Sequence, residues 1–360
     1  MQYLPRRAPI ISANPSSPAK AMRAPAPRGV STGRKLILLL VLAAVLLALV
    51  LLSLAIGSRQ LPLGDVITAL TDPAPTVERS IVVESRLPRA LLAVLAGLGL
   101  GVAGVLAQSL TRNPLAEPGI LGVNAGASLA IVISVGFLGV QGFNGYVVFA
   151  FLGALLTTAV VYLVGMPRPG SSDPVRLVLS GVAIGAVLTG VGTALSLIKP
   201  QAFDQLRAWT IGSLQGRDSS IVLTLAGCLL VGLVLAASSA RSLDSLALGE
   251  DSARSLGTNI GRTRVLVLLA ITILAGASTA AVGAIGFIGL MAPHAARRLA
   301  GAHTGWIIAF TALIAPMLLL CADMLGRVLL PGELQAGVVA AFLGAPLLIM
   351  IARGKKAVAL

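Results

Sequence analysis

Residues 239–264, SARSLDSLALGEDSARSLGTNIGRTR, interrupt a chain that from residue 36 onward consists almost entirely of long apolar runs. The stretch mixes charges of both signs with leucines. Its charged members are Arg241, Asp244, Glu250, Asp251, Arg254, Arg262 and Arg264. A mixed-charge segment between membrane spans is typical of a short surface helix that a soluble partner contacts. We therefore expect a second protein to bind here.

The chain contains no phosphate-binding loop of the Gly-x-x-x-x-Gly-Lys-Ser/Thr type. If the chain takes part in an energy-dependent process, the energy must come from another subunit. Residues 239–264 are where that subunit would contact the chain and transmit force to it. The chain itself is therefore not predicted to be an enzyme, and no cofactor is expected.

The composition is that of a polytopic membrane protein. Hydrophobic residues make up 56% of the chain and charged residues 11%, and the mean hydropathy is +0.95. Soluble domains average about 25% charged residues. The 40 glycines suit tightly packed helices in lipid, where small residues let backbones approach closely.

Ten stretches are apolar enough to cross a membrane, which takes about 20 residues per helix. We expect an all-α protein with ten transmembrane helices. Two spans share the uncharged region 118–167, which breaks at Gly139–Gly145, and two share 265–296, which we divide near Val282–Gly283. The other six are residues 36–57, 90–111, 177–198, 219–240, 305–322 and 334–352.

The distribution of positive charge orients these spans. With both termini in the cytoplasm, 19 of the 27 Lys and Arg residues fall on cytoplasmic segments, as the positive-inside rule requires. The net charge of +14 therefore reflects membrane topology, and no nucleic-acid partner is predicted. Residues 1–35 are rich in Pro, Ala, Ser and Arg and are predicted to be a disordered cytoplasmic tail. A cleaved signal peptide is disfavoured because the apolar run that follows is too long.

Arginines mark the outer ends of two spans. Arg86 and Arg89 precede the second span, and Arg327 follows the ninth. They are either snorkelling interfacial residues or a basic rim for an acidic partner, since exposed arginines pair well with carboxylates. Asp323 lies four residues before Arg327, which predicts an i,i+4 pair that orients the arginine in preference to a proton relay.

Neither a metal site nor a disulfide is predicted. Cys228 and Cys321 lie in apolar runs and are expected to be packing residues. His294 and His303 have no further ligands at metal-binding spacing. The segment 113–118, Asn-Pro-Leu-Ala-Glu-Pro, is predicted to be an inner loop that is either a rigid corner or a secondary contact with the energy-supplying subunit.

Several blocks that lie in order along the chain resemble one family. They are RLPR at 86–89, TRNPLAEPGILGVNAGAS at 111–128, LGEDSARSLG at 248–257, GAIGFIGLMAPH at 283–294, and PGEL at 331–334 followed by GAP at 344–346. Together they resemble the FecCD/BtuC-type permeases of bacterial ABC importers for iron–siderophores, haem and cobalamin. The runs NAGAS at 124–128, DQLRAW at 204–209 and RVLLPGE at 327–333 most resemble the ferric-enterobactin (FepD-type) branch.

The resemblance implies a BtuC-like, type II importer fold over residues 36–355 in the bacterial cytoplasmic membrane. It implies a second permease chain, identical or paralogous, two copies of an ABC ATPase, and a siderophore-binding protein that is periplasmic or a lipoprotein. It also implies that the cytoplasmic segment couples the ATPase to the spans, and the residues assigned to this coupling are Leu243, Leu246, Leu248, Gly249, Glu250, Asp251, Ala253, Arg254, Leu256 and Gly257.

By the same resemblance, Arg86, Arg89 and Arg327 match arginines that in the cobalamin member face carboxylates of the binding protein. The family's inner gate matches Ser172, Asp173, Pro174 and Val175. Asp173-Pro174 departs there from the small hydroxyl residues of the cobalamin pattern.

The leading hypothesis is thus a ferric-siderophore importer permease, with haem or cobalamin as alternative cargo. Two other classes stay open. An ion-coupled secondary transporter would usually keep several buried ionisable groups along its pathway, and the sequence offers Asp323. A membrane scaffold or sensor would bind a partner without moving any substrate.

Overall fold

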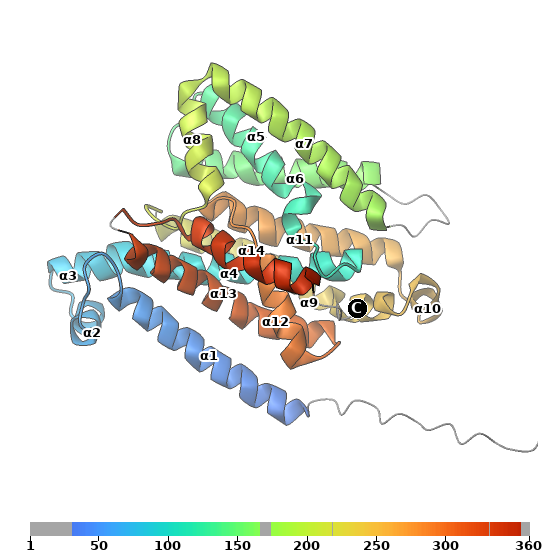
Figure 1. Ribbon diagram of the computed structural model, residues 1–360, viewed down its shortest axis with the longest axis horizontal. Helices are drawn as coiled ribbons and strands as arrows, with labels where there is room; N and C mark the ends of the chain where they lie inside the picture. The colour runs from blue at the N-terminus through green and yellow to red at the C-terminus, as the bar shows by residue number, and fades with distance from the viewer. Residues whose placement is uncertain (1–30, 166–173, 218, 331, 354–360) are drawn as a thin grey trace, which may run out of the picture.

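The computed structural model describes residues 31–165, 174–217, 219–330 and 332–353, and in these ranges the chain is helical without any strand. Figure 1 shows the long helices α1, α7, α11 and α13 running in roughly the same direction, with the shorter α8 across them. Their bounds are α1 Thr32–Ala55, α2 Leu63–Thr71, α3 Val77–Arg79, a π-helical η1 Ser80–Arg86, α4 Leu87–Thr111, a 3-10 η2 Pro118–Leu121, α5 Val123–Gly136, α6 Phe143–Gly165, α7 Pro174–Ile198, α8 Pro200–Ile211, α9 Ser219–Ala247, α10 Glu250–Ser255, α11 Ile260–Val282, α12 Ile288–Ala300, α13 Thr304–Leu329 and α14 Ala336–Arg353.

Helices occupy all ten of the predicted apolar stretches. Within the described residues, seven of these helices are long and apolar enough to cross a membrane: those that contain α1, α4, α6, α7, α9, α11 and α13. The remaining three, α5, α12 and α14, are shorter, at 14, 13 and 18 residues. The all-helical membrane fold is therefore confirmed, whereas ten full spans remain a prediction.

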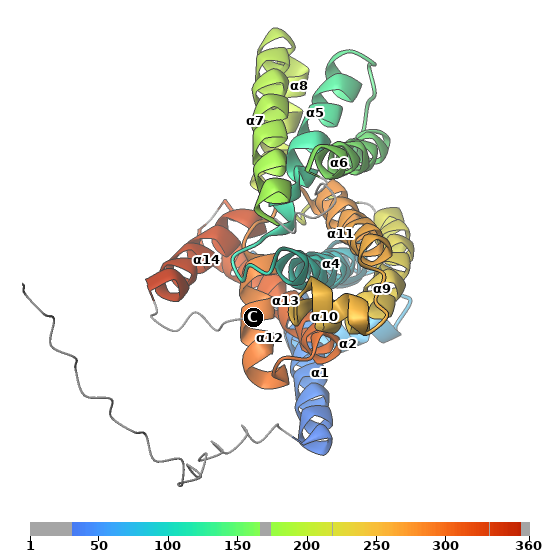
Figure 2. The same cartoon turned by 90° about the vertical axis from the view of Figure 1, so that its right-hand side faces the viewer.

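Helix α4 is the centre of the bundle, and Figure 2 shows α9, α11, α12 and α13 around it. Small residues make this packing close. A Cβ added at Gly97 would lie 2.7 Å from the Pro316 Cα of α13, so any side chain there would push the two helices apart. Close approach through small residues is how helices associate in lipid.

The predicted break in region 265–296 is confirmed. Helix α11 ends at Val282, and Gly283 follows with a φ of 86°, in the left-handed region that glycine tolerates without strain. The Ser213 amide donates to the Val282 carbonyl at 2.8 Å, which satisfies this helix end.

Other elements differ from the predictions. Helix α1 begins at Thr32, inside the predicted tail, and residues 1–30 lie outside the described residues. Helices α2, α3 and α8 lie between the predicted spans, in segments for which no helix was predicted. In Figure 1, α2 and α3 lie at one end of the bundle and α10 at the other.

Candidate functional site

The segment after α9 folds into a short helix bounded by two glycines. Gly249 adopts φ 106° and ψ 154°, which turns the chain sharply between α9 and α10. Gly257 adopts a φ of 79°. Its amide donates a hydrogen bond to the Arg254 carbonyl at 2.9 Å, and the Thr258 amide donates one to the Ala253 carbonyl at 2.9 Å. This pair of hydrogen bonds forms a Schellman cap, which requires a residue in the left-handed conformation directly after the helix.

Glu250 fixes α10 to α11. Its carboxylate accepts from Arg264 of α11 at 2.6 Å and from Arg254 of α10 at 3.3 Å, and the Glu250 side chain is only 10% exposed. The carboxylate lies in the first turn of α10, where it also complements the positive end of the helix. Helix α10 therefore lies in a defined position and is not a free loop.

The predicted contact residues separate into two groups. Leu243 and Leu246 belong to α9 and are buried, as is Ala253 of α10. These three pack inside the chain and do not form its surface, so their part in coupling to a partner stays a prediction. Leu248 and Leu256 are 68% and 64% exposed and flank α10. The exposed charges of the segment are Arg241, Asp251, Arg254 and Arg262.

Two polar contacts connect the end of α9 next to α10 to the rest of the bundle. The Arg112 guanidinium, just after α4, donates to the Leu246 carbonyl at 2.7 Å. The Asp244 carboxylate accepts from the Thr304 amide at 2.8 Å and so caps the start of α13. A force on α10 would thus reach α4, α11 and α13 through direct contacts.

Two of the outer arginines are buried. Arg86 donates to the Leu54 and Ala55 carbonyls at 2.7 and 2.9 Å. Arg327 donates to the Ser53 and Ile56 carbonyls at 2.8 and 3.1 Å. Both arginines thereby satisfy the free carbonyls at the end of α1. The expectation that they are exposed is wrong, because the end of α1 covers them.

Arg89 forms the remaining part of the cluster. Its guanidinium pairs with Asp323 at 2.8 Å and with Glu333 at 3.0 Å, and its side chain is 11% exposed. Asp323 is fully buried and also pairs with Arg327 one turn along α13, so the predicted i,i+4 pair is confirmed. The three arginines do gather at one end of the bundle, with two acids of the same chain.

Glu117 is a half-buried acid whose contact the sequence did not reveal. Its Oε1 accepts from the Phe287 amide at 2.8 Å, at the start of α12. Glu117 lies in the non-helical connection between α4 and η2, as predicted, and this connection reaches Leu100, midway along α4. A carboxylate between two prolines, Pro114 and Pro118, was the available signal, but its partner is 170 residues away.

The gate residues are only partly described. Ser172 and Asp173 lie outside the described residues, Pro174 begins α7, and Val175 is 56% exposed. Among the described residues, no group of His, Cys, Asp and Glu could hold a metal ion. His303 instead lies 3.5 Å from Asp244, and His294 lies 3.3 Å from Arg298.

Comparison with known proteins supports the architecture. The model of the FecCD transport family matches residues 45–354. The chain belongs to the FecCD transport family. It is 46% identical over 320 residues to the ferric enterobactin transport system permease protein FepD of Escherichia coli K12, covering 89% of this chain and 94% of that one.

Two further similarities agree with this family assignment. The Fe(3+)-citrate import system permease protein YfmD of Bacillus subtilis 168 is 39% identical over 303 residues, covering 84% of this chain and 90% of that one. An inward-facing ABC transporter described as metal-chelate type superposes with a TM-score of 0.76 at 26% identity, covering 89% of this chain and all of that chain. The fold is therefore that of an ABC importer permease.

Proposed function

We propose that this chain is the membrane-spanning permease subunit of an ATP-driven importer of ferric siderophores. The observation that carries the proposal is the 46% identity to the FepD permease over nearly the whole of both chains. Ten spans, with both termini in the cytoplasm of a bacterial cell, agree with the charge distribution. Two ATPase copies, a second permease chain and a siderophore-binding protein complete the transporter.

ATP-driven closure of the ATPase dimer would act on α10. The surface offered to the ATPase consists of the exposed Leu248 and Leu256 and the charges of Asp251 and Arg254. Glu250 transmits the displacement to α11 through Arg264. The buried members of the predicted contact set, Leu243 and Leu246, would act from inside by fixing the end of α9.

Docking of the binding protein would take place at the opposite end. Arg89 is the candidate contact, because its side chain keeps some exposure and lies beside the surface residue Glu333. A carboxylate of the binding protein would replace Glu333 as its partner. Arg86 and Arg327 support this site by holding the end of α1. The gate around Pro174 and Val175 remains a proposal by family resemblance.

The test is uptake of iron-loaded siderophore into proteoliposomes that contain this chain, its ATPase and its binding protein. ATP-dependent accumulation that requires all three components supports the proposal. Comparing catecholate, hydroxamate, haem and cobalamin cargo distinguishes the siderophore importer from the haem and cobalamin alternatives. Flux without the ATPase that collapses with the proton gradient would instead show a secondary transporter, and no flux with any cargo would contradict the assignment.

A further inference from the structure

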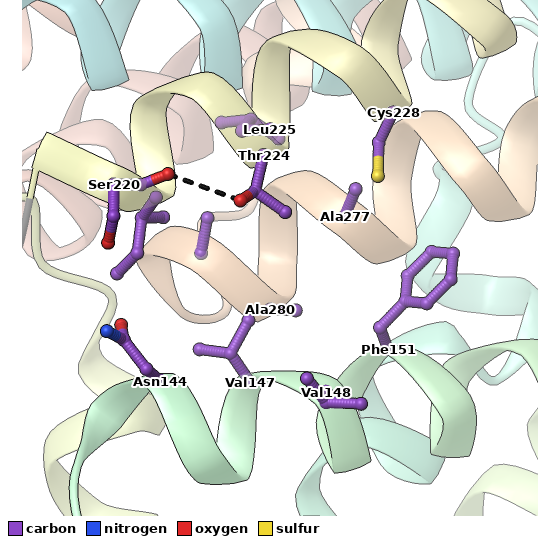
Figure 3. Close-up of a pocket in the computed structure, with 12 residues that line it drawn as sticks. Asn144, Val147, Val148, Phe151, Ser220, Thr224, Leu225, Cys228, Ala277 and Ala280 are labelled. Carbon is purple, nitrogen blue, oxygen red and sulfur yellow. Dashed lines mark hydrogen bonds between the residues drawn. The ribbon is translucent and has the colours of Figure 1, made fainter.

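A groove of about 320 Å³ opens between α6, α9 and α11, at the end of the bundle opposite α10. Figure 3 shows side chains of α6 and α9 along its walls and alanines of α11 at its floor. We call it the α6–α9 groove. It contains none of the residues assigned above to the ATPase contact, the arginine cluster or the gate.

The groove exists because its floor is made of small side chains. Ala277, Ala280 and Ala281 are 7%, 1% and 2% exposed, and their methyl groups leave the space between α6 and α9 unfilled. Protein interiors are close-packed, and a gap of this size forfeits the dispersion contacts of every atom that lines it. The stable state of the protein in a membrane therefore has the groove occupied.

The sides of the groove face hydrocarbon. Both wall helices belong to candidate membrane spans, and the side chains beside the opening are apolar and exposed, with Val148 at 57%, Leu152 at 45% and Leu223 at 79%. A segment of this kind in a membrane is bathed by lipid chains. The volume lies near the lower limit of about 300 Å³ for small-molecule pockets, which suits one chain better than a whole lipid.

Polarity varies along the groove. Asn144 and Ser220 lie at its outer end, where α6 and α9 begin, and Phe151 and Cys228 lie at its deep end. The rise along α6 from Asn144 to Phe151 is about 10 Å at 1.5 Å per residue. The Thr224 hydroxyl between them already donates to the Ser220 carbonyl at 3.2 Å. The groove is thus polar at its mouth and apolar below it, as a lipid is.

A cation lies next to the mouth. The Arg217 guanidinium lies 3.8 Å from the centre of the ring of Phe143, the residue that precedes Asn144 in α6. Phe143 and Tyr146 pack edge to face at 5.1 Å, which holds this cation at the start of α6. Among the described residues Arg217 has no carboxylate partner, and its Nε has no acceptor; Asp218 lies outside them.

We propose that the α6–α9 groove binds one acyl chain of an anionic phospholipid, with its phosphate headgroup paired to Arg217. An acyl chain gains little free energy when it moves from the bilayer into an equally apolar groove. The acyl chain therefore fills the space, and the contact of the headgroup with Arg217 determines which lipid binds. Guanidinium and phosphate form bidentate, charge-assisted hydrogen bonds. An anionic headgroup is therefore selected over a zwitterionic one, independently of the transported cargo.

The headgroup is tested by native mass spectrometry of the full chain in detergent, titrated with phosphatidylglycerol or phosphatidylethanolamine. We expect phosphatidylglycerol to bind about tenfold more tightly, and Arg217→Gln to abolish the preference. Arg207→Gln removes an exposed arginine of α8 at the same end and should retain it. Equal binding of the two lipids to the unmodified protein would overturn the proposal.

The groove itself is tested with Ala277→Leu, which fills the floor and should remove the tightly bound lipid. Ala237→Leu, at an exposed position of α9, is the matched control. If Ala277→Leu is unstable, Cys228 provides a second measurement in a Cys321→Ala background, because bound phosphatidylglycerol should slow its reaction with a membrane-permeant thiol reagent several-fold. Unchanged labelling, or a Cys228 disulfide between two copies of the chain, would show that lipid is not the occupant.

Discussion

Gly249→Ala should uncouple ATP hydrolysis from transport. Gly249 adopts φ 106° and ψ 154°, a conformation that is essentially restricted to glycine and costs other residues about 1–3 kcal/mol. No atom lies within 4 Å of a Cβ built there, so backbone strain is the whole effect. The strain is relieved when α10 rotates away from its position against α11. Because about 1.4 kcal/mol is a factor of ten, the competent orientation should lose roughly fivefold to 140-fold in population.

The assay measures siderophore uptake and ATP hydrolysis together in proteoliposomes that hold all components. We expect uptake per ATP to fall in Gly249→Ala while the complex still assembles. Gly261→Ala is the matched control, since Gly261 lies in the first turn of α11 in helical conformation, where alanine is favourable. An unchanged uptake per ATP in an assembled Gly249→Ala transporter would refute the view that the orientation of α10 couples ATP hydrolysis to transport.

Three further predictions concern the ends and the middle of the bundle. Asp323→Asn breaks a buried ion pair and should cost about 3–5 kcal/mol, visible as a lower unfolding temperature, whereas Glu333→Gln at the more exposed acid should cost under about 1 kcal/mol. Glu117→Ala leaves the half-buried Phe287 amide without its acceptor and should cost about 1–3 kcal/mol in the same assay, most of which Glu117→Gln should restore. Arg89→Ala should weaken binding-protein capture by the assembled permease at least fivefold; unchanged capture would place docking elsewhere.

The sequence was a good guide to where helices lie in the membrane. Hydropathy located all ten apolar helices, and the glycine after Val282 marked the break between α11 and α12. Hydropathy depends on local composition, which a single sequence displays directly. The short helices α2, α3 and α8 were missed because they lie between the apolar runs that hydropathy detects.

The burial of the arginines could not be predicted in the same way. Arg86 donates hydrogen bonds to carbonyls about 30 residues earlier in the chain, and Arg327 donates hydrogen bonds to carbonyls more than 270 residues earlier. At the end of a span, an arginine that caps another helix and an arginine that faces water have the same local sequence. The contact of Glu117 with Phe287 was hidden for the same reason.

The α10 segment and the arginine cluster share two helices. Helix α4 carries Arg89 near its start, and Arg112 follows its other end in contact with α9. Helix α13 begins at Thr304, which Asp244 of α9 caps, and near its other end presents Asp323 to Arg89. Both helices are therefore connected to the segment next to α10 and to each other.

The packing between α4 and α13 makes it improbable that they move separately. Gly97 brings the α4 backbone against Pro316 so closely that even a methyl group would clash, and close-packed interfaces shift between discrete arrangements without deforming continuously. A displacement of α9 and α10 would then move α4 and α13 as one body and carry Arg89 and Asp323 with it. If the binding protein docks at Arg89 and the ATPase acts on α10, as proposed, both would act on the same element, so each should change the affinity for the other.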